Sequence, residues 1–163
     1  LFEGAQGFGL DIDHGDYPYV TSSHCTTAAA LLNGVPPQAI RKVWGVAKIY
    51  ETYVGAKPFQ PEGDVFNALQ LIGEEFGATT GRKRQCNWMN LNNLIKAVRM
   101  NGVTDLVFNK MDVLREVGEW KFYNDANLME FEEEEQVKSW LTSHISLASP
   151  VSNVYFSGNK DRI

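Results

Sequence analysis

The residues best suited to nucleotide chemistry form the stretch NKMD at residues 109–112, which follows a short apolar run. A carboxylate such as that of Asp112 can accept hydrogen bonds from two adjacent N–H groups of guanine, a pair that adenine does not offer. The aliphatic stem of Lys110 can lie along the face of the same base. GTPases hold guanine with Asn-Lys-x-Asp at the end of a strand, but three fixed residues in four also occur by chance. The stretch alone is therefore a weak indication of a guanine site.

A second candidate is the basic loop GATTGRKR at residues 77–84, which combines hydroxyl groups with cations. A guanidinium can bind a carboxylate through two parallel hydrogen bonds, so Arg82 or Arg84 could hold a small dianion. The glycines at positions 77 and 81 would let the loop close over a substrate. A solvated basic loop with no ligand is an equally good interpretation of the residues themselves.

The third candidate is the opening segment LFEGAQGFGLDIDHGDYPYVTSS at residues 1–23. Its apolar start breaks at once into glycines, which predicts the end of a buried strand followed by a sharp turn. The amide of Gln6 both donates and accepts hydrogen bonds, and the hydroxyl triplet that begins at Thr21 suits phosphate or sugar oxygens. A chain that opens on a strand also suggests a fragment whose partner strands lie upstream. The alternative is an ordinary glycine-rich, acidic surface loop.

Length and composition indicate one soluble globular domain over residues 1–163, with 44% hydrophobic and 21% charged residues. A net charge of -5 disfavours a nucleic acid as partner, because phosphate backbones bind basic faces. The sequence has no apolar run long enough for a membrane span and no signal peptide pattern. Its two cysteines and three histidines match no metal spacing, which favours free thiols in a reducing cytoplasm over a zinc site.

Hydrophobic periodicity predicts helices and strands in alternation along the chain. The expected strands cover residues 46–54, 103–108, 120–123 and 151–156. The expected helices cover residues 26–32, a segment from Pro36 to Trp44, residues 62–76, a segment capped by Asn90 and ended by Gly102, and a segment after the glutamates at 130–135.

Such alternation is typical of an α/β fold with a largely parallel sheet flanked by helices. Ligands of these sheets bind beyond the carboxyl ends of the strands. Gln6, the NKMD stretch and Ser157 each follow an expected strand, so we expect them at the edge of the sheet where ligands bind.

Three stretches of the opening segment, LFEGAQG, LDIDHG and YPYVTSS, closely resemble the adenylosuccinate synthetase family. The resemblance continues through VGA at residues 54–56, GATTGR at 77–82 and NKMDVL at 109–114. It implies a P-loop NTPase-like α/β fold, of which this chain would be a C-terminal part covering less than half of the family's usual length. It also implies a purine-biosynthesis ligase that joins L-aspartate to IMP with hydrolysis of GTP.

The resemblance implies a role for ten residues of this sequence. Those matching IMP-binding positions are Gln6, Thr21, Val54 and Arg82. Those matching aspartate-binding positions are Thr79, Thr80, Arg82 and Arg84. Those matching GTP-binding positions are Arg84, which lies between aspartate and GTP in the family, and Lys110, Asp112 and Ser157.

In the family, GTP phosphorylates the 6-oxygen of the purine, and the amine of aspartate then displaces that phosphate. Such a reaction depends largely on positioning and on electrostatic stabilisation of the phosphoryl oxygens. The family's phosphate loop, catalytic residues and Mg²⁺ ligands match no part of this sequence, and Asp13 and His14 match a structural segment. The resemblance therefore implies that the chain alone is inactive and that the whole protein is a cytoplasmic homodimer.

Several positions depart from the family pattern. Tyr53 replaces an arginine, FQPE at residues 59–62 replaces Phe-Pro-Thr-Glu, His24-Cys25 replaces one asparagine, and SGNKDR at 157–162 replaces Ser-Thr-Gly-Pro-Asp-Arg. These departures keep two alternatives open. One is a viral-type relative that joins aspartate to dGMP, forming 2-aminoadenylosuccinate, with ATP or GTP as donor. The other is a nucleotide-binding module without catalysis. A freestanding GTPase is disfavoured, because no G-x-x-x-x-G-K-[ST] occurs.

Overall fold

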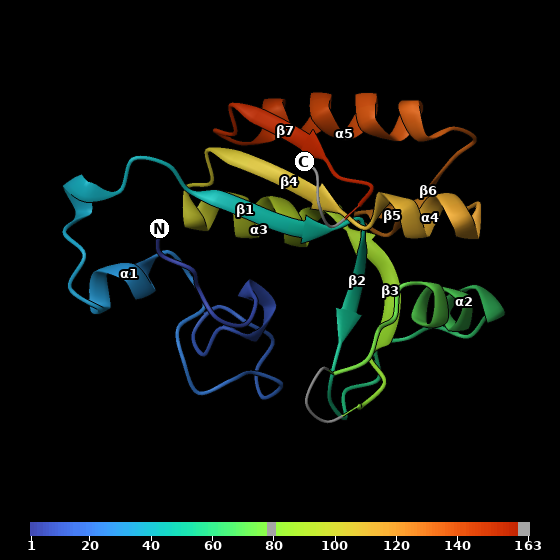
Figure 1. The fold of residues 1–163 in the computed structure, drawn as a ribbon, viewed down its shortest axis with the longest axis horizontal. Coiled ribbons are helices and arrows are strands. Elements are labelled where there is room, and N and C mark those ends of the chain that lie inside the picture. Colours follow the sequence, from blue (N-terminus) through green and yellow to red (C-terminus); the bar gives the residue numbers. More distant parts are fainter. Residues whose placement is uncertain (78–80, 160–163) are drawn as a thin grey trace.

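The fold is built around a parallel three-stranded sheet in a computed structural model that describes residues 1–77 and 81–159. Its strands are β1 (Trp44–Lys48), β4 (Asp105–Asn109) and β7 (Asn153–Phe156), in the order β1-β4-β7 (Figure 1). All residues of the central strand β4 except Asn109 are buried, as expected for a parallel strand covered on both faces. The predicted α/β architecture is confirmed.

A second sheet has four strands in the order β2-β3-β5-β6. They are β2 (Tyr50–Tyr53), β3 (Gln85–Asn90), β5 (Trp120–Asn124) and β6 (Asn127–Phe131). Only the central pair β3–β5 is parallel, so the expectation of a largely parallel sheet holds for the first sheet alone. Sequence analysis missed β3 and β6, which are short and contain several polar residues.

The predicted strand over residues 46–54 is wrong as a single element. The chain changes sheet at Ile49: Lys48 pairs with Asn109 in the first sheet, whereas Tyr50 pairs with Trp88 in the second. Ile49 is 1% exposed, and its N–H donates to the carbonyl of Asn109 at 3.1 Å. One run of β-forming residues therefore serves both sheets.

The helices are α1 (Ala28–Leu32), α2 (Asp64–Ile72), α3 (Leu91–Asn101), α4 (Met111–Val117) and α5 (Glu134–Ala148). As predicted, the side chain of Asn90 caps α3 by accepting two backbone N–H groups, and Gly102 ends the helix with φ of 61°. The helix expected from Pro36 to Trp44 is wrong. Only the 3₁₀ turn Pro37–Ala39 forms, and Trp44 begins β1.

Helices α2 to α5 contribute to one hydrophobic core with the sheets. Helix α2 contacts α4 and β3, α3 contacts β3 and β5, and α5 contacts β6. Helix α5 buries Val137, Leu141 and Ile145, as their helical spacing indicates. On β1, Trp44 and Val46 stay 48% and 68% exposed, so this strand is covered on one face only. Among the described residues, none of the helices is both long and apolar enough to cross a membrane.

The opening segment does not begin with the strand that was expected. Leu1 and Phe2 are exposed and form no strand, and the first regular element is the 3₁₀ turn Phe8–Leu10. The segment contacts the rest of the chain mainly through α3 and the loop after β2. Lys96 donates to the carbonyl of His14 at 3.4 Å, and Asp16 forms an ion pair with Lys57. Gln6 consequently does not follow a strand.

Candidate functional site

The carboxyl ends of the three parallel strands bring two of the predicted guanine-contacting segments together. Asn109 ends β4 beside Lys48, which ends β1, and Ser157 directly follows β7. The backbone of Ser157 donates to Phe108 at 2.7 Å and accepts from Met111 at 3.3 Å. The NKMD stretch and the start of the C-terminal loop are thus adjacent, as the strand-end argument predicted.

The NKMD stretch crosses from β4 into α4 through a left-handed residue. Lys110 has φ of 65° at the start of α4, and its ammonium donates to the carbonyl of Gly73 at 2.9 Å. Asp112 is exposed in the first turn of the helix, which leaves its carboxylate accessible to a ligand. The side-chain oxygen of Asn109 is buried and, within the described residues, accepts no hydrogen bond. Ser157 is 6% exposed, and its hydroxyl donates to the carbonyl of Asn159.

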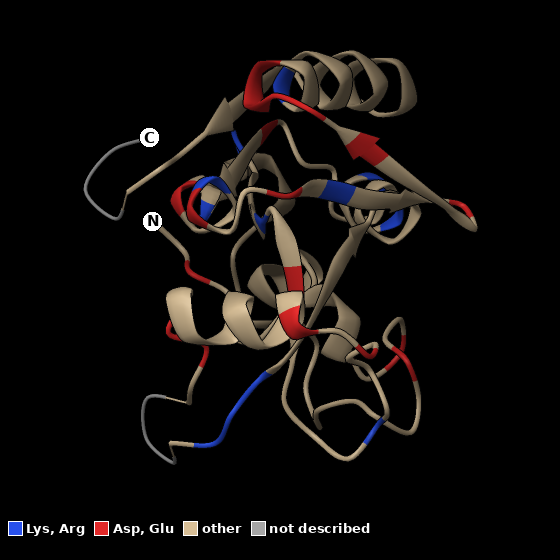
Figure 2. Ribbon diagram, turned by 90° about the vertical axis from the view of Figure 1, so that its right-hand side faces the viewer, with Lys and Arg blue, Asp and Glu red and all other residues tan. Residues whose placement is uncertain are grey.

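The basic loop has a closed base. The N–H of Arg84 donates to the carbonyl of Glu75 at 2.9 Å, and that of Gly77 donates to Arg82 at 2.8 Å. Arg82 is exposed, whereas the side chain of Arg84 is 33% exposed. Figure 2 shows the basic residues that follow the grey segment 78–80 at the opposite end of the molecule from the acidic start of α5. Thr79 and Thr80 lie outside the described residues.

A buried carboxylate, which sequence analysis missed, links this loop to the strands. Glu75 is 1% exposed and accepts hydrogen bonds from Lys48 at 2.7 Å, from the hydroxyl of Tyr50 at 2.7 Å and from Arg84 at 3.0 Å. Lys48 also donates to Thr52 at 3.0 Å. A strand over residues 46–54 would place Lys48, Tyr50 and Thr52 on one face, because side chains alternate between the two faces of a strand. That polar face in an otherwise apolar stretch was the available signal.

The residues of this cluster shift one another's pKa values. Burial alone would raise the pKa of Glu75, but hydrogen bonds from Lys48 and Tyr50 and the nearby cations hold it below its usual value. The pKa of Lys48 is also lowered, because burial disfavours its charge more than the carboxylate stabilises it. Both pKa values are lowered, but this favours the charged form of Glu75, which receives three donors, and disfavours the charged form of Lys48, which shares one carboxylate with Arg84. Burial and the hydrogen bond to Glu75 raise the pKa of Tyr50, so its hydroxyl remains a donor.

The predicted IMP-contacting residues of the N-terminal half are not joined to this strand-end group. Gln6 is exposed with φ of 64°, and Val54 is 45% exposed just after β2. Thr21 is half-buried, and its N–H donates to Leu10 at 2.8 Å. Within residues 1–77 and 81–159, no hydrogen bond connects these three residues to Arg84 or Lys110. Their assignment to one nucleotide site remains a prediction.

Three of the departures from the family pattern have structural roles of their own. The side chain of Gln60 accepts from the N–H of Cys86 at 3.0 Å, at the edge of β3. Tyr53 packs its ring against Phe59, with centroids 5.7 Å apart. The N–H of Cys25 donates to the carboxylate of Asp11 at 2.6 Å. These contacts stabilise loops, so the departures alone do not indicate a different ligand.

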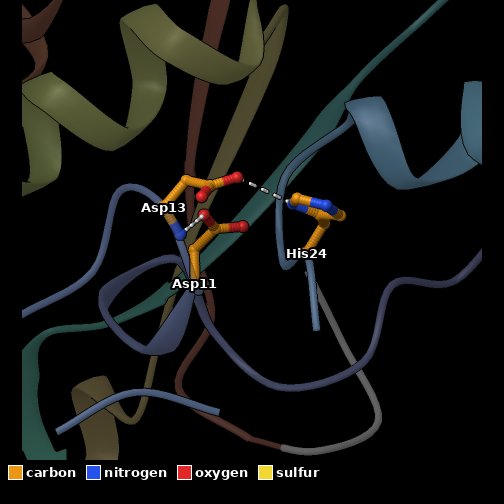
Figure 3. Close-up of side chains that lie close together, drawn as sticks. All are labelled: Asp11, Asp13 and His24. Carbon is orange, nitrogen blue, oxygen red and sulfur yellow. Dashed lines mark hydrogen bonds and ion pairs between the residues drawn. The ribbon is translucent and has the colours of Figure 1, made fainter. Parts of the chain in front are cut away.

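A cluster of potential metal ligands joins the opening segment to the residue after it: Asp11, Asp13 and His24 place one ligand atom each within 4.8 Å of one another (Figure 3). The buried carboxylate of Asp11 already accepts N–H groups of Asp13, His14 and Cys25. Burial alone would raise the pKa of Asp11, but these bonds keep it lowered. Mg²⁺ requires octahedral oxygen ligands, and here one carboxylate is committed to backbone amides and one ligand is an imidazole. The cluster does not fit Mg²⁺.

Comparison with known proteins agrees with the sequence motifs. A sequence model of the adenylosuccinate synthetase family matches residues 1–155. Curated adenylosuccinate synthetases are 48% identical over 124 residues in Oleidesulfovibrio alaskensis and 52% identical over 117 residues in Nitratidesulfovibrio vulgaris. These alignments cover 74% and 70% of this chain but 29% and 28% of the relatives. The chain therefore spans less than a third of the length of these relatives.

Two solved structures share the fold. The fully ligated adenylosuccinate synthetase of Plasmodium falciparum aligns with a TM-score of 0.70 at 33% identity, over 84% of this chain and 35% of that chain. The succinoaminodeoxyadenylate synthetase of cyanophage S-2L, bound to dGMP and dATP, aligns with a TM-score of 0.55 at 19% identity, over 87% of this chain and 49% of that chain. The second likeness concerns the fold alone. The match over residues 1–155 and the shared fold show that this chain belongs to the adenylosuccinate synthetase family.

Proposed function

We propose that this chain is the C-terminal part of a ligase that joins L-aspartate to IMP, with GTP as phosphoryl donor and adenylosuccinate as product. The observation that carries the proposal is the assembly of the NKMD stretch with Ser157 at the carboxyl ends of β4 and β7, in a chain of this family. Ligands of parallel α/β sheets bind at this edge. The free thiols of Cys25 and Cys86 agree with a cytoplasmic location.

In this proposal, the guanine base of GTP binds beside α4. The exposed carboxylate of Asp112 accepts from the two adjacent N–H groups of guanine, and the stem of Lys110 lies along the ring. Lys110 is suited to this role because its ammonium is already tied to Gly73, which limits the rotamers of the side chain. Ser157 supplies the opposite wall of the base pocket through the loop that it begins.

Aspartate and the phosphates bind at the basic loop, through Thr79, Thr80, Arg82 and Arg84. A guanidinium fork on the carboxylates of aspartate would hold its amine at the 6-carbon of the purine, where it displaces the phosphate. IMP would contact Gln6, Thr21, Val54 and Arg82. Mg²⁺ would supply charge neutralisation on the donor phosphates, and its ligands would come from outside this chain. The whole protein would be a homodimer.

The proposal is tested by measuring turnover with a full-length protein that contains this chain. One reaction contains Mg²⁺, L-aspartate, IMP and GTP, and a parallel reaction contains dGMP with ATP or GTP. We expect adenylosuccinate to form in the first reaction only, and its ultraviolet absorbance measures its formation. Turnover of dGMP alone would replace the proposal by the viral-type activity. Nucleotide binding without turnover in either reaction would leave a binding module, and the 163-residue chain by itself is expected to be inactive.

A further inference from the structure

The turn at residues 73–75 connects the two candidate binding regions. The carbonyl of its first residue, Gly73, accepts a hydrogen bond from the ammonium of Lys110 at 2.9 Å. The carboxylate of its last residue, Glu75, accepts one from the guanidinium of Arg84 at 3.0 Å. Lys110 belongs to the NKMD stretch, and Arg84 closes the basic loop. One short turn therefore contacts a residue from each region.

The carboxylate of Glu75 is held from several sides. Lys48 approaches both of its oxygens at 2.7 Å, and Tyr50 donates to one of them at 2.7 Å. The third contact of Lys48 is the hydroxyl of Thr52, so every N–H of that ammonium has a partner inside the protein. Lys48 thus acts within the cluster and is not available as a ligand of its own.

Arg84 differs from Lys48 in this respect. A guanidinium carries five N–H donors, and within the described residues only one nitrogen of the Arg84 guanidinium contacts a side chain, the carboxylate of Glu75. Its side chain is 33% exposed, whereas that of Glu75 is 1% exposed. The buried carboxylate consequently fixes one corner of the guanidinium and leaves other donors for an anion.

Packing leaves this turn little freedom. A Cβ added at Gly73 would lie 2.3 Å from the hydroxyl of Tyr50 and 2.7 Å from the carbonyl of Leu69. The same hydroxyl donates to Glu75, so the backbone at Gly73 and the carboxylate at Glu75 are both fixed against Tyr50. Such close packing restricts the side chains that hydrogen-bond to this turn, Lys110 and Arg84, to a narrow range of positions.

We propose that Glu75 is a positioning residue, which holds Arg84 in place for an anionic substrate while the same turn holds Lys110. This inference rests on the proposed function for the identity of the anion, L-aspartate. Glu75 itself touches no substrate. The effect of its carboxylate passes through Arg84, because within the described residues Arg84 is the basic-loop side chain that contacts this carboxylate.

Nitrogen-15 NMR of the arginine side chains in the 163-residue chain tests the positioning without any activity. The signals of the Arg84 guanidinium are expected to show restricted motion in wild type and motional averaging in Glu75→Gln. This substitution keeps the shape of the Glu75 side chain but removes its charge. Glu74→Gln is the matched control, because Glu74 is exposed and adjacent in sequence. An Arg84 signal that is equally mobile in wild type and Glu75→Gln would overturn the proposal.

A double-mutant cycle in the full-length enzyme then tests the substrate effect. Glu75→Gln is expected to raise the KM for L-aspartate about 10- to 100-fold, as for loss of a hydrogen bond to a charged group, while Glu74→Gln leaves it unchanged. The double variant Glu75→Gln with Arg84→Lys is expected to match Arg84→Lys alone, because Glu75 acts through Arg84. Fully additive losses would indicate general destabilisation and overturn the proposal. A wild-type enzyme without turnover would refute the proposed function, whereas the NMR result would still decide the positioning.

Discussion

At the scale of single residues, the candidate site combines exposed groups that are able to bind with buried groups that hold them. Asp112 is exposed, whereas Glu75 is buried behind Arg84. The motif residues Lys110, Asp112 and Arg84 could be predicted from the sequence, because their types suit guanine and anions. Glu75 could not, since a glutamate at the end of an amphipathic helix is usually a solvated residue, and only the fold reveals its three donors.

Asp112→Asn is expected to weaken GTP binding about 10- to 100-fold and to reduce the preference for guanine over adenine, because an amide cannot accept both N–H groups of the base. The measurement is displacement of a fluorescent guanine nucleotide from the full-length protein. Glu116→Gln, an exposed change on the same helix, is the control and should bind GTP as wild type does. Unchanged GTP binding in Asp112→Asn would remove this residue from the base pocket.

Gly73→Ala is expected to lower the free energy of unfolding by about 1–3 kcal/mol, because the added methyl group overlaps the hydroxyl of Tyr50. Urea unfolding followed by tryptophan fluorescence measures the loss. Gly9→Ala is a suitable control, since a Cβ at Gly9 meets no atom within 4 Å. Equal midpoints for both variants would mean that the turn at residues 73–75 adjusts without cost.

At the scale of elements, the sequence predicted helices well where a cap residue or an apolar face marks them, but it missed α4 and wrongly placed a helix before β1. The cap at Asn90, the end at Gly102 and the inward face of α5 follow from local rules that involve neighbours in sequence. The change of sheet at Ile49 does not, because both halves of the run have the same alternation and differ only in their partners, Asn109 and Trp88. Strand β3 was missed although its buried Cys86 and Trp88 flank Asn87, because its polar side chains bind a loop that is distant in sequence, as in the contact of Asn87 with Phe59.

Asn90→Ala is expected to destabilise the protein by about 1 kcal/mol, because the backbone N–H groups of Asn92 and Asn93 lose their acceptor at 3.0 and 3.1 Å. The urea midpoint again measures the effect. Asn93→Ala serves as the comparison: Asn93 is exposed in the first turn of α3 and contributes only its backbone to the cap. The capping role would be contradicted if the two substitutions had the same effect.

At the scale of the whole molecule, buried charge makes stability depend on pH. The pKa of Glu75 is lowered from 4.5, since donors and cations outweigh the effect of burial, so its contribution is present above pH 4.5 and is lost as the pH falls through the lower folded-state pKa. The difference in unfolding free energy between wild type and Glu75→Gln should therefore be largest near neutral pH and shrink below pH 4.5. Urea titrations at several pH values measure it. A difference that stays constant down to pH 3 would show that the charge of Glu75 contributes nothing, and Glu74→Gln should follow wild type throughout.

The α/β architecture and the adjacency of the NKMD stretch and Ser157 at one edge of the sheet were also predictable at this scale, because the alternation of helices and strands extends along the chain. The structure of the opening segment was not predictable: Leu1 and Phe2 are apolar residues that suit a strand, but both are exposed and lie before the first regular element, the 3₁₀ turn Phe8–Leu10. The relative placement of Gln6, Thr21 and the strand-end residues depends on contacts that no periodicity encodes.

The closed base of the basic loop has a consequence for protein engineering. Backbone hydrogen bonds join Glu75 to Arg84 and Gly77 to Arg82, so both ends of the loop are fixed independently of its internal sequence. The entropic contribution to the free energy of closing a loop changes by only about 0.6 kcal/mol when the loop doubles in length. The segment between residues 77 and 82 could thus be exchanged for that of another family member as a cassette. Substrate preference could then be varied while the folded scaffold is retained.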